Sequence, residues 1–261
     1  MRKKYFKKYW RYKYKHKTQK KHLLLVFLFI SVFIFLFYLV CLFPGFQIKE
    51  IKIMGNEKIK SSEIEELINS LTEKKVLFVR SRSIFLANTS RIEENILSRF
   101  PAIERVSVKK RLPQKIEIII KERKPIGVIS KEGYYLLIDY HGVIFEKVKD
   151  KGDLLELVPS EDLENLELGE IAVPEELINA ISKIEKQCRE NDVEIDSIKI
   201  ISPRRLNAKT EQGWEIYFNP SEDISRQLLN LKVALDEKIS PKERKSLEYI
   251  DLRFGNQIFY K

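Results

Sequence analysis

Leu23 to Phe43 form an unbroken run of 21 residues without a charged side chain. As an α-helix, this run would be about 31 Å long, which matches the hydrocarbon core of a bilayer. A helix buried in a soluble protein keeps a polar stripe, whereas the only polar groups here are Ser31 and the Tyr38 hydroxyl. The run therefore predicts a transmembrane helix that anchors the chain from Leu23 to Phe43.

The residues before this run indicate how it is oriented. Residues 1–22 contain eleven Lys and Arg residues and no Asp or Glu. Because such basic segments stay on the cytoplasmic side, we expect a cytoplasmic tail over 1–22 and an extracytoplasmic location for everything after the span. The tail also carries aromatic residues that could stack on RNA bases, but its position beside the membrane favours contact with anionic lipid. Specific nucleic-acid binding is not expected.

Two other readings of the apolar run are less consistent with the sequence. A cleavable signal peptide has a shorter apolar region and a small-residue cleavage site, which Cys41-Leu42-Phe43-Pro44-Gly45 does not provide. Lipidation at Cys41 would need a small residue beside it, whereas Val40 precedes it. Cys41 is better explained as an apolar residue near the outer end of the helix.

The part after the span is large enough for one or two domains with proper cores. Without the tail, the chain has 37 basic and 38 acidic residues, so the basicity belongs to the tail alone. The two cysteines are Cys41 in the span and Cys188 far along the chain, which makes a disulfide between them geometrically implausible. The exported part must therefore depend on its core for stability.

Residues 46–124 follow the order strand, helix, helix, strand, strand. Each predicted helix opens with a Ser followed three residues later by a Glu, the spacing of a capping box, and then shows an apolar stripe. These features are Ser62 with Glu65 and the stripe Ile64, Leu67, Ile68 and Leu71, then Ser90 with Glu93 and the stripe Ile92, Ile96 and Phe100. An apolar connecting stretch around Val76–Val79 separates the helices. Both helices are expected to pack on one face of a three-stranded sheet.

Pro125 marks the boundary to a second predicted domain over 125–261. Alternating apolar residues predict strands at 126–129, 134–138, 143–145, 195–201, 213–218 and 249–254. Helical spacing predicts one helix from Pro174 to Cys188 and another from Ser221 to Glu237. The whole chain is thus expected to be an α+β protein with one N-terminal transmembrane helix and a second domain whose sheet is mostly antiparallel.

Several motifs occur in a recognisable order. They are Ile51-Lys52-Ile53-Met54-Gly55-Asn56, Phe100-Pro101-Ala102-Ile103, Leu112-Pro113, Glu122-Arg123-Lys124-Pro125, the hairpin Leu137–Phe145 and the ending Tyr249-Ile250-Asp251-Leu252-Arg253-Phe254. Together with the basic tail and single anchor, this series resembles the FtsQ/DivIB family of bacterial cell-division proteins. The resemblance implies a POTRA domain (β-α-α-β-β) over 46–124 and the family's C-terminal β domain over 125–261. It is weakest over Lys149–Ala172.

The sequence does not assemble the parts of a catalytic site. The exported part has one histidine, His141, in a predicted turn, and one thiol, Cys188, on a core stripe. Carboxylates are interleaved with Lys and Arg, as on solvated helix faces, and there is no glycine-rich phosphate loop. We therefore expect no enzymatic activity, cofactor, metal or small-molecule substrate.

The resemblance also implies a partner-binding region. In the family, the last strand of the second domain binds the FtsB-type partner, with the FtsL-type protein in the same complex. Carried over to this chain, the implied contact residues are Arg253, Phe254, Gly255, Asn256, Gln257, Ile258, Phe259 and Tyr260, with Arg204 or Arg205 as a salt-bridge donor. Alternation along the strand leaves a second reading open, in which Phe254 is a core residue and the following strand is a plain sheet edge.

The leading hypothesis is a bitopic scaffold of the bacterial divisome, located in the inner membrane at the division septum. An alternative is a POTRA-containing protein that assists export or outer-membrane assembly, although such proteins usually repeat the domain or append a barrel. A third is an anchored cell-wall enzyme whose acidic residues converge only in the folded protein.

Overall fold

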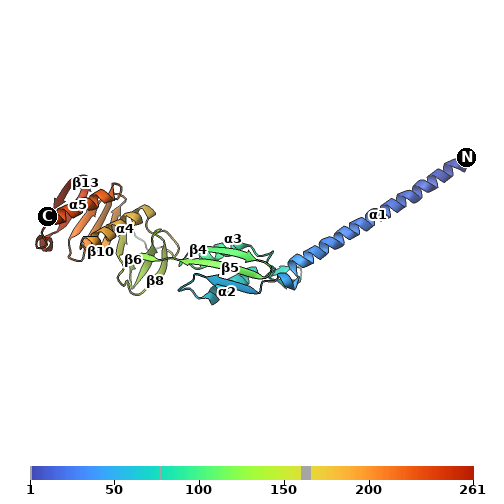
Figure 1. Ribbon diagram of the computed structural model, residues 1–261, viewed down its shortest axis with the longest axis horizontal. Helices are drawn as coiled ribbons and strands as arrows, with labels where there is room; N and C mark the ends of the chain where they lie inside the picture. Colours follow the sequence, from blue (N-terminus) through green and yellow to red (C-terminus); the bar gives the residue numbers. More distant parts are fainter. Residues whose placement is uncertain (1, 77, 160–165) are drawn as a thin grey trace. The chain divides into compact units, whose positions relative to one another are not determined.

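The computed structural model describes residues 2–76, 78–159 and 166–261, with side chains from residue 21 onward (Figure 1). The lipid contact predicted for the basic tail depends on side chains outside this range. The chain forms two compact units: one runs to Ile96 and includes Arg105–Lys121, and the other comprises Leu97–Glu104 and Glu122–Lys261.

The first unit begins with helix α1 (Arg2–Cys41), which extends through the basic tail. Its segment Lys21–Cys41 is the one helix in the described residues that is long and apolar enough to cross a membrane. The helix ends two residues before the predicted Phe43, because Pro44 keeps the preceding residue extended (φ −61°, ψ 124°). A short 3-10 turn, η1 (Pro44–Phe46), follows.

The first unit contains the predicted three-stranded sheet. Its strands are β1 (Glu50–Met54), β4 (Ile103–Arg111) and β5 (Lys115–Glu122), in the order β1-β5-β4 with β1 parallel to β5. Ile116 and Ile118 of β5 are fully buried, whereas Ile119 is exposed. One face of the sheet is therefore covered and the other is open, as expected for helices on one face.

Helices α2 (Ser61–Thr72) and α3 (Thr89–Arg99) bury the predicted stripes, with Ile64 and Ile68 on one and Ile92 and Ile96 on the other. The predicted capping boxes are wrong. At α2 the N-cap is Lys60, whose side chain makes no capping bond. At α3 the side-chain oxygen of Asn88 accepts the Arg91 N–H (3.1 Å), while the Glu93 carboxylate accepts the Val108 N–H (2.7 Å).

The apolar stretch between these helices forms a small hairpin rather than a plain connection. Its strands are β2 (Lys74–Val76) and β3 (Val79–Ser81). Short strands of this kind give too few alternating positions to be detected from sequence.

The second unit is built on a nine-stranded sheet of order β14-β13-β12-β11-β10-β9-β6-β7-β8 (Figure 1). The strands are β6 (Pro125–Lys131), β7 (Tyr134–Asp139), β8 (Ile144–Val148), β9 (Glu156–Pro159), β10 (Ile195–Ser202), β11 (Arg205–Thr210), β12 (Glu215–Phe218), β13 (Tyr249–Phe254) and β14 (Gln257–Tyr260). Five of the eight neighbouring pairs are antiparallel, so the expected α+β fold with a mostly antiparallel sheet is confirmed.

Helices α4 (Glu175–Glu190) and α5 (Ile224–Glu237) complete the second unit, with a 3-10 turn, η2 (Glu243–Ser246), before β13. Their buried residues belong to one core cluster with alternating residues of the sheet, among them Ile216 and Ile250. The helices therefore cover one face of β10 to β13. Within Lys149–Ala172, where the family resemblance is weakest, β9 is inserted between β6 and β10, and residues 160–165 lie outside the described residues.

Candidate partner-binding edge

Strand β14 is the last strand on one side of the large sheet. Among the described strands its one neighbour is β13, to which it is antiparallel, with Ile250 opposite Tyr260 and Asp251 opposite Phe259. An edge strand presents backbone N–H and C=O groups that no neighbouring strand uses. The sequence placed this strand at a sheet edge, and the topology confirms that position.

The pairing registers bring four residues into one row across the sheet: Asn207 on β11, Tyr217 on β12, Asp251 on β13 and Phe259 on β14. Side chains alternate between the faces of a sheet, and the flanking positions of this row are in the helix-covered core. The row therefore lies on the face away from α4 and α5. We call this surface the open face.

Aromatic rings and guanidinium groups gather on the open face. The Arg205 guanidinium lies 5.0 Å from the centre of the Tyr217 ring, and the Arg253 guanidinium lies 5.5 Å from the same centre. Tyr217 also stacks on Tyr249, with ring centres 5.4 Å apart and planes 15° apart. Such cation–π contacts hold the two arginines against one ring.

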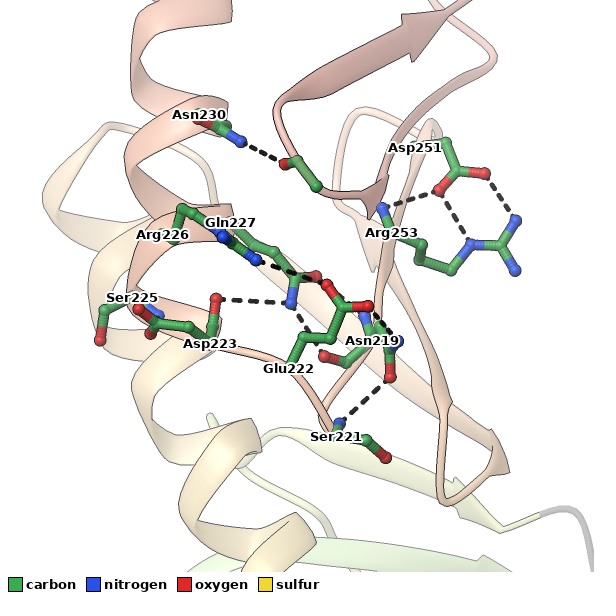
Figure 2. A network of polar contacts seen from close by, with 11 residues as sticks. Asn219, Ser221, Glu222, Asp223, Ser225, Arg226, Gln227, Asn230, Asp251 and Arg253 are labelled. Carbon is green, nitrogen blue, oxygen red and sulfur yellow. Dashed lines mark hydrogen bonds and ion pairs between the residues drawn. The ribbon is translucent and has the colours of Figure 1, made fainter.

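Asp251 fixes the orientation of Arg253. Its carboxylate accepts hydrogen bonds from Arg253 Nε–H (2.8 Å) and Nη2–H (2.5 Å), and this bidentate contact is visible in Figure 2. The hydrogen bond to Asp251 raises the pKa of Arg253 above its usual value. Burial raises the pKa of Tyr217, and the neighbouring Glu215 adds to this effect. The tyrosine is thus neutral and the arginine charged at physiological pH.

Arg205 and Arg253 both contact the Tyr217 ring, whereas Arg204 does not belong to this group. Arg204 is exposed in the turn between β10 and β11, where its backbone N–H bonds to Ser202 Oγ (3.2 Å). Within the described residues, Arg205 makes a hydrogen bond to Asn207 (3.0 Å) and no ion pair. Of the two salt-bridge candidates, Arg205 is therefore the one on the open face.

Phe254 is not a core residue. It is 56% exposed, because the register between β13 and β14 shifts after Asp251 and breaks the alternation expected from the sequence. Its ring meets Phe259 edge to face, with centres 5.5 Å apart. Phe254 and Phe259 thus form an exposed aromatic pair beside the edge.

The rest of the predicted contact segment forms the turn and the strand itself. Gly255 has φ +65°, and its carbonyl accepts a hydrogen bond from the side chain of Asn230 on α5 (3.0 Å). Asn256, Gln257 and Tyr260 are exposed, and Ile258 packs partly against the core. The turn is thus tied to the helix layer while most of the strand stays accessible.

Sequence reasoning missed Tyr217, Tyr249 and Asp251 as members of this surface. The alternation within each strand did indicate that these residues face away from the core. Tyr217 stands between the apolar residues Ile216 and Phe218, and Tyr249 and Asp251 stand on either side of Ile250. The alternation could not show that the three residues lie together. That depends on the pairing of β12 with β13, which are separated in the chain by α5, and the sequence pattern does not specify this pairing.

The second unit contains one cysteine, Cys188, and one histidine, His141. Burial raises the pKa of the Cys188 thiol to about 12, so this group is not a thiolate nucleophile at neutral pH. His141, the one histidine in the sequence after residue 22, lies 2.8 Å from the Glu175 carboxylate. No group of three or more His, Cys, Asp or Glu suited to a metal occurs in the part of the chain that the structure describes.

An apolar N-terminal helix, a β-α-α-β-β unit and a second sheet with an accessible last strand define a single-span, POTRA-bearing class of membrane protein. Comparisons with known proteins agree with this class. Residues 46–123 match the model of the FtsQ-type POTRA domain, and residues 127–253 match the model of the C-terminal domain of cell division protein FtsQ/DivIB. The chain belongs to the FtsQ/DivIB family of cell division proteins.

Curated relatives carry the same designation along most of the chain. Cell division protein DivIB of Clostridium acetobutylicum is 29% identical over 227 residues, which cover 84% of this chain and 85% of that protein. DivIB of Clostridium tetani is 27% identical, covering 83% of this chain and 80% of the relative. Cell division protein FtsQ of Geotalea daltonii is 25% identical, covering 83% and 76%. A role in the divisome, at the septal membrane, fits this family and the single apolar helix.

Proposed function

We propose that this protein is a non-enzymatic, bitopic scaffold that links other divisome proteins through its extracytoplasmic part. In this proposal 1–22 is the cytoplasmic tail, 23–43 the anchor, 46–124 the POTRA domain and 125–261 the partner-binding domain. The observation that carries the proposal is the accessible edge of β14 next to the open face. Both features offer contacts to a protein and neither offers reactive groups.

The partner is proposed to add an extended segment to β14. Main-chain hydrogen bonds along the edge would supply affinity, and side chains on alternate positions would supply specificity. Phe259 lies on the open face, whereas Ile258 packs against the core. Successive side chains of the partner strand would therefore lie alternately on the open face and on the helix-covered face. This geometry suits the FtsB-type protein, with the FtsL-type protein in the same complex.

Charge on the open face indicates which partner segments fit. Arg205 and Arg253 are held against Tyr217, and Arg253 is already paired with Asp251. Arg205 is the cation left for a carboxylate of the partner. An extended segment with an acidic residue directed over the open face is therefore favoured.

The test is co-purification of the tagged full-length chain with an FtsB-type partner from detergent-solubilised membranes. Deleting Gly255–Lys261 is expected to abolish co-purification while leaving the first unit folded, as judged by limited proteolysis. The double substitution Phe259→Glu, Tyr260→Glu keeps the strand but places charge on it, and it should weaken binding by about tenfold or more.

Leu112→Glu is the control, because it places the same charge on an exposed apolar residue of the first unit, in the turn between β4 and β5. The control should co-purify like the unchanged chain. Partner binding that survives the deletion would show that β14 is not the binding edge.

A further inference from the structure

Side chains of the first unit hold the outer end of α1. Ser81 Oγ donates to the carbonyl of Cys41, Ser83 Oγ donates to the carbonyl of Val40, and Gln47 Nε2 also donates to Cys41 (3.2 Å). The last carbonyls of a helix have no partner within the helix, so these bonds satisfy groups that would otherwise need water. Segment 81–83 is thereby fixed at the end of the apolar span.

The β2–β3 hairpin extends from this point. Ser81 is the last residue of β3, and the register pairs Val76 with Val79 and Lys75 with Arg80. Because side chains alternate along a strand, Val79 shares the face of Ser81, which is turned to the end of α1. Phe78 is three residues from Ser81, about 10 Å along an extended chain. The tip of the hairpin therefore lies close to the level at which the span leaves the hydrocarbon.

The tip is apolar and accessible. Phe78 is 93% exposed and Val79 is 52% exposed. Lys75 of β2 and Arg80 of β3 form the pair next to the tip and place positive charge there, and Arg80 also contacts Glu73 (3.1 Å). Exposed aromatic and aliphatic groups flanked by basic residues are the composition of elements that bind the interface of an anionic membrane.

Aromatic residues also cluster just after the end of the span. Phe46 meets Phe43 and Phe85 edge to face, with ring centres 5.7 Å and 5.0 Å away. Phe43 and Phe85 are both exposed, and Phe43 lies just after the end of the span. Aromatic rings are enriched at this depth of membrane proteins, where they lie between head groups and hydrocarbon.

We propose that the β2–β3 hairpin is a lipid-binding element: Phe78 and Val79 insert into the interface of the bilayer that α1 crosses, and Lys75 and Arg80 contact anionic head groups. The proposal rests on the membrane-spanning role of α1 in the proposed function. It does not depend on which leaflet the hairpin meets or on any protein partner.

The test measures the depth of residue 78 in a membrane. The full-length chain with Cys41→Ala and Cys188→Ala receives Phe78→Cys, is labelled with a nitroxide and is reconstituted into phosphatidylglycerol–phosphatidylethanolamine vesicles. Power saturation then compares accessibility to oxygen, which concentrates in lipid, with accessibility to a water-soluble nickel complex. The oxygen-to-nickel ratio at residue 78 is expected to be several-fold higher than at a matched label on Glu65→Cys, an exposed position of α2.

Equal oxygen-to-nickel ratios at residues 78 and 65 would overturn the proposal. The exposed Phe78 would then be explained better by contact with another protein than by contact with lipid. Adding Lys75→Glu should lower the ratio at residue 78 in these anionic vesicles and leave it unchanged in phosphatidylcholine vesicles. A ratio indifferent to Lys75→Glu in both would refute the head-group contact. Failure of the β14 proposal would not alter these ratios, because the vesicles contain this chain alone.

Discussion

Asp139 shows how a single charged residue organises the second unit. Its side chain is fully buried, and every oxygen has a partner. One oxygen accepts the backbone N–H groups of His141 (3.0 Å) and Val143 (2.9 Å), and the other contacts Arg123 (2.5 Å). Arg123 also donates to the carbonyl of Pro101 (3.0 Å). Asp139 thus holds both the backbone of the β7–β8 turn and the mostly buried guanidinium of Arg123.

Replacing Asp139 by Asn should destabilise the second unit strongly. The variant leaves the Arg123 guanidinium without its counter-charge in a mostly buried position, which typically costs about 3–5 kcal/mol. Chemical denaturation of the detergent-solubilised chain, followed by the fluorescence of Trp214, measures the loss. The control is Glu190→Gln, which removes an exposed ion pair with Lys186 and should cost about 1 kcal/mol or less. Similar losses for both variants would contradict this account of Asp139.

At the scale of elements, the apolar stripes were sufficient to locate the helices. Ile64 and Ile68, like Ile92 and Ile96, are buried where helical spacing placed them, because burying one stripe determines which side of a helix meets the sheet. Helix ends were harder to predict. Asn88 caps α3 in place of Ser90, since the cap depends on where the backbone leaves the helix and not on residue type alone.

Strands β9 and β11 were not predicted. Strand β9 has four residues and pairs in parallel with β6 and β10, so nothing near it in sequence indicates its neighbours. Strand β11 alternates only Leu206 and Ala208 with polar residues, a weak apolar pattern. The position of β14 was predictable because it follows β13 through a short turn, whereas the row that includes Tyr217 depends on pairings between distant segments.

The β13–β14 turn offers a test at this scale. Gly255 has φ +65°, where a side chain is strained, although no atom lies within 4 Å of the position that a Cβ would take. Gly255→Ala should therefore cost about 1–2 kcal/mol through the backbone alone. Thermal unfolding of the second unit measures this cost, with Gly133→Ala at the equally open β6–β7 turn (φ +81°) as the matched comparison. Only Gly255→Ala should also weaken co-purification of the partner. Weakening by both variants would indicate general destabilisation.

At the scale of the whole molecule, charge is distributed very unevenly. The first 22 residues carry eleven positive charges and no acidic residue, while the remainder is close to neutral. Basic residues beside a span resist export, so from this asymmetry we expect the tail to stay in the cytoplasm.

The predicted orientation can be tested with intact spheroplasts. Protease added outside should digest the chain beyond Gly45 and leave a membrane-protected fragment that contains the tail and the span. A reporter fused to the N-terminus should stay inaccessible until the membrane is permeabilised. A chain that resists the external protease, combined with an accessible N-terminal reporter, would reverse the orientation.

The bonds from Ser81, Ser83 and Gln47 to the last turn of α1 also have a mechanical consequence. A freely jointed anchor would swivel without disturbing the body it tethers. Here three hydrogen bonds to the carbonyls of Val40 and Cys41 fix the end of α1, so a tilt or rotation of the helix in the bilayer would be transmitted as torque to the rest of the first unit. Replacing α1 by another apolar helix, joined to the first unit through a flexible linker, would keep the chain attached to the membrane but would no longer transmit torque.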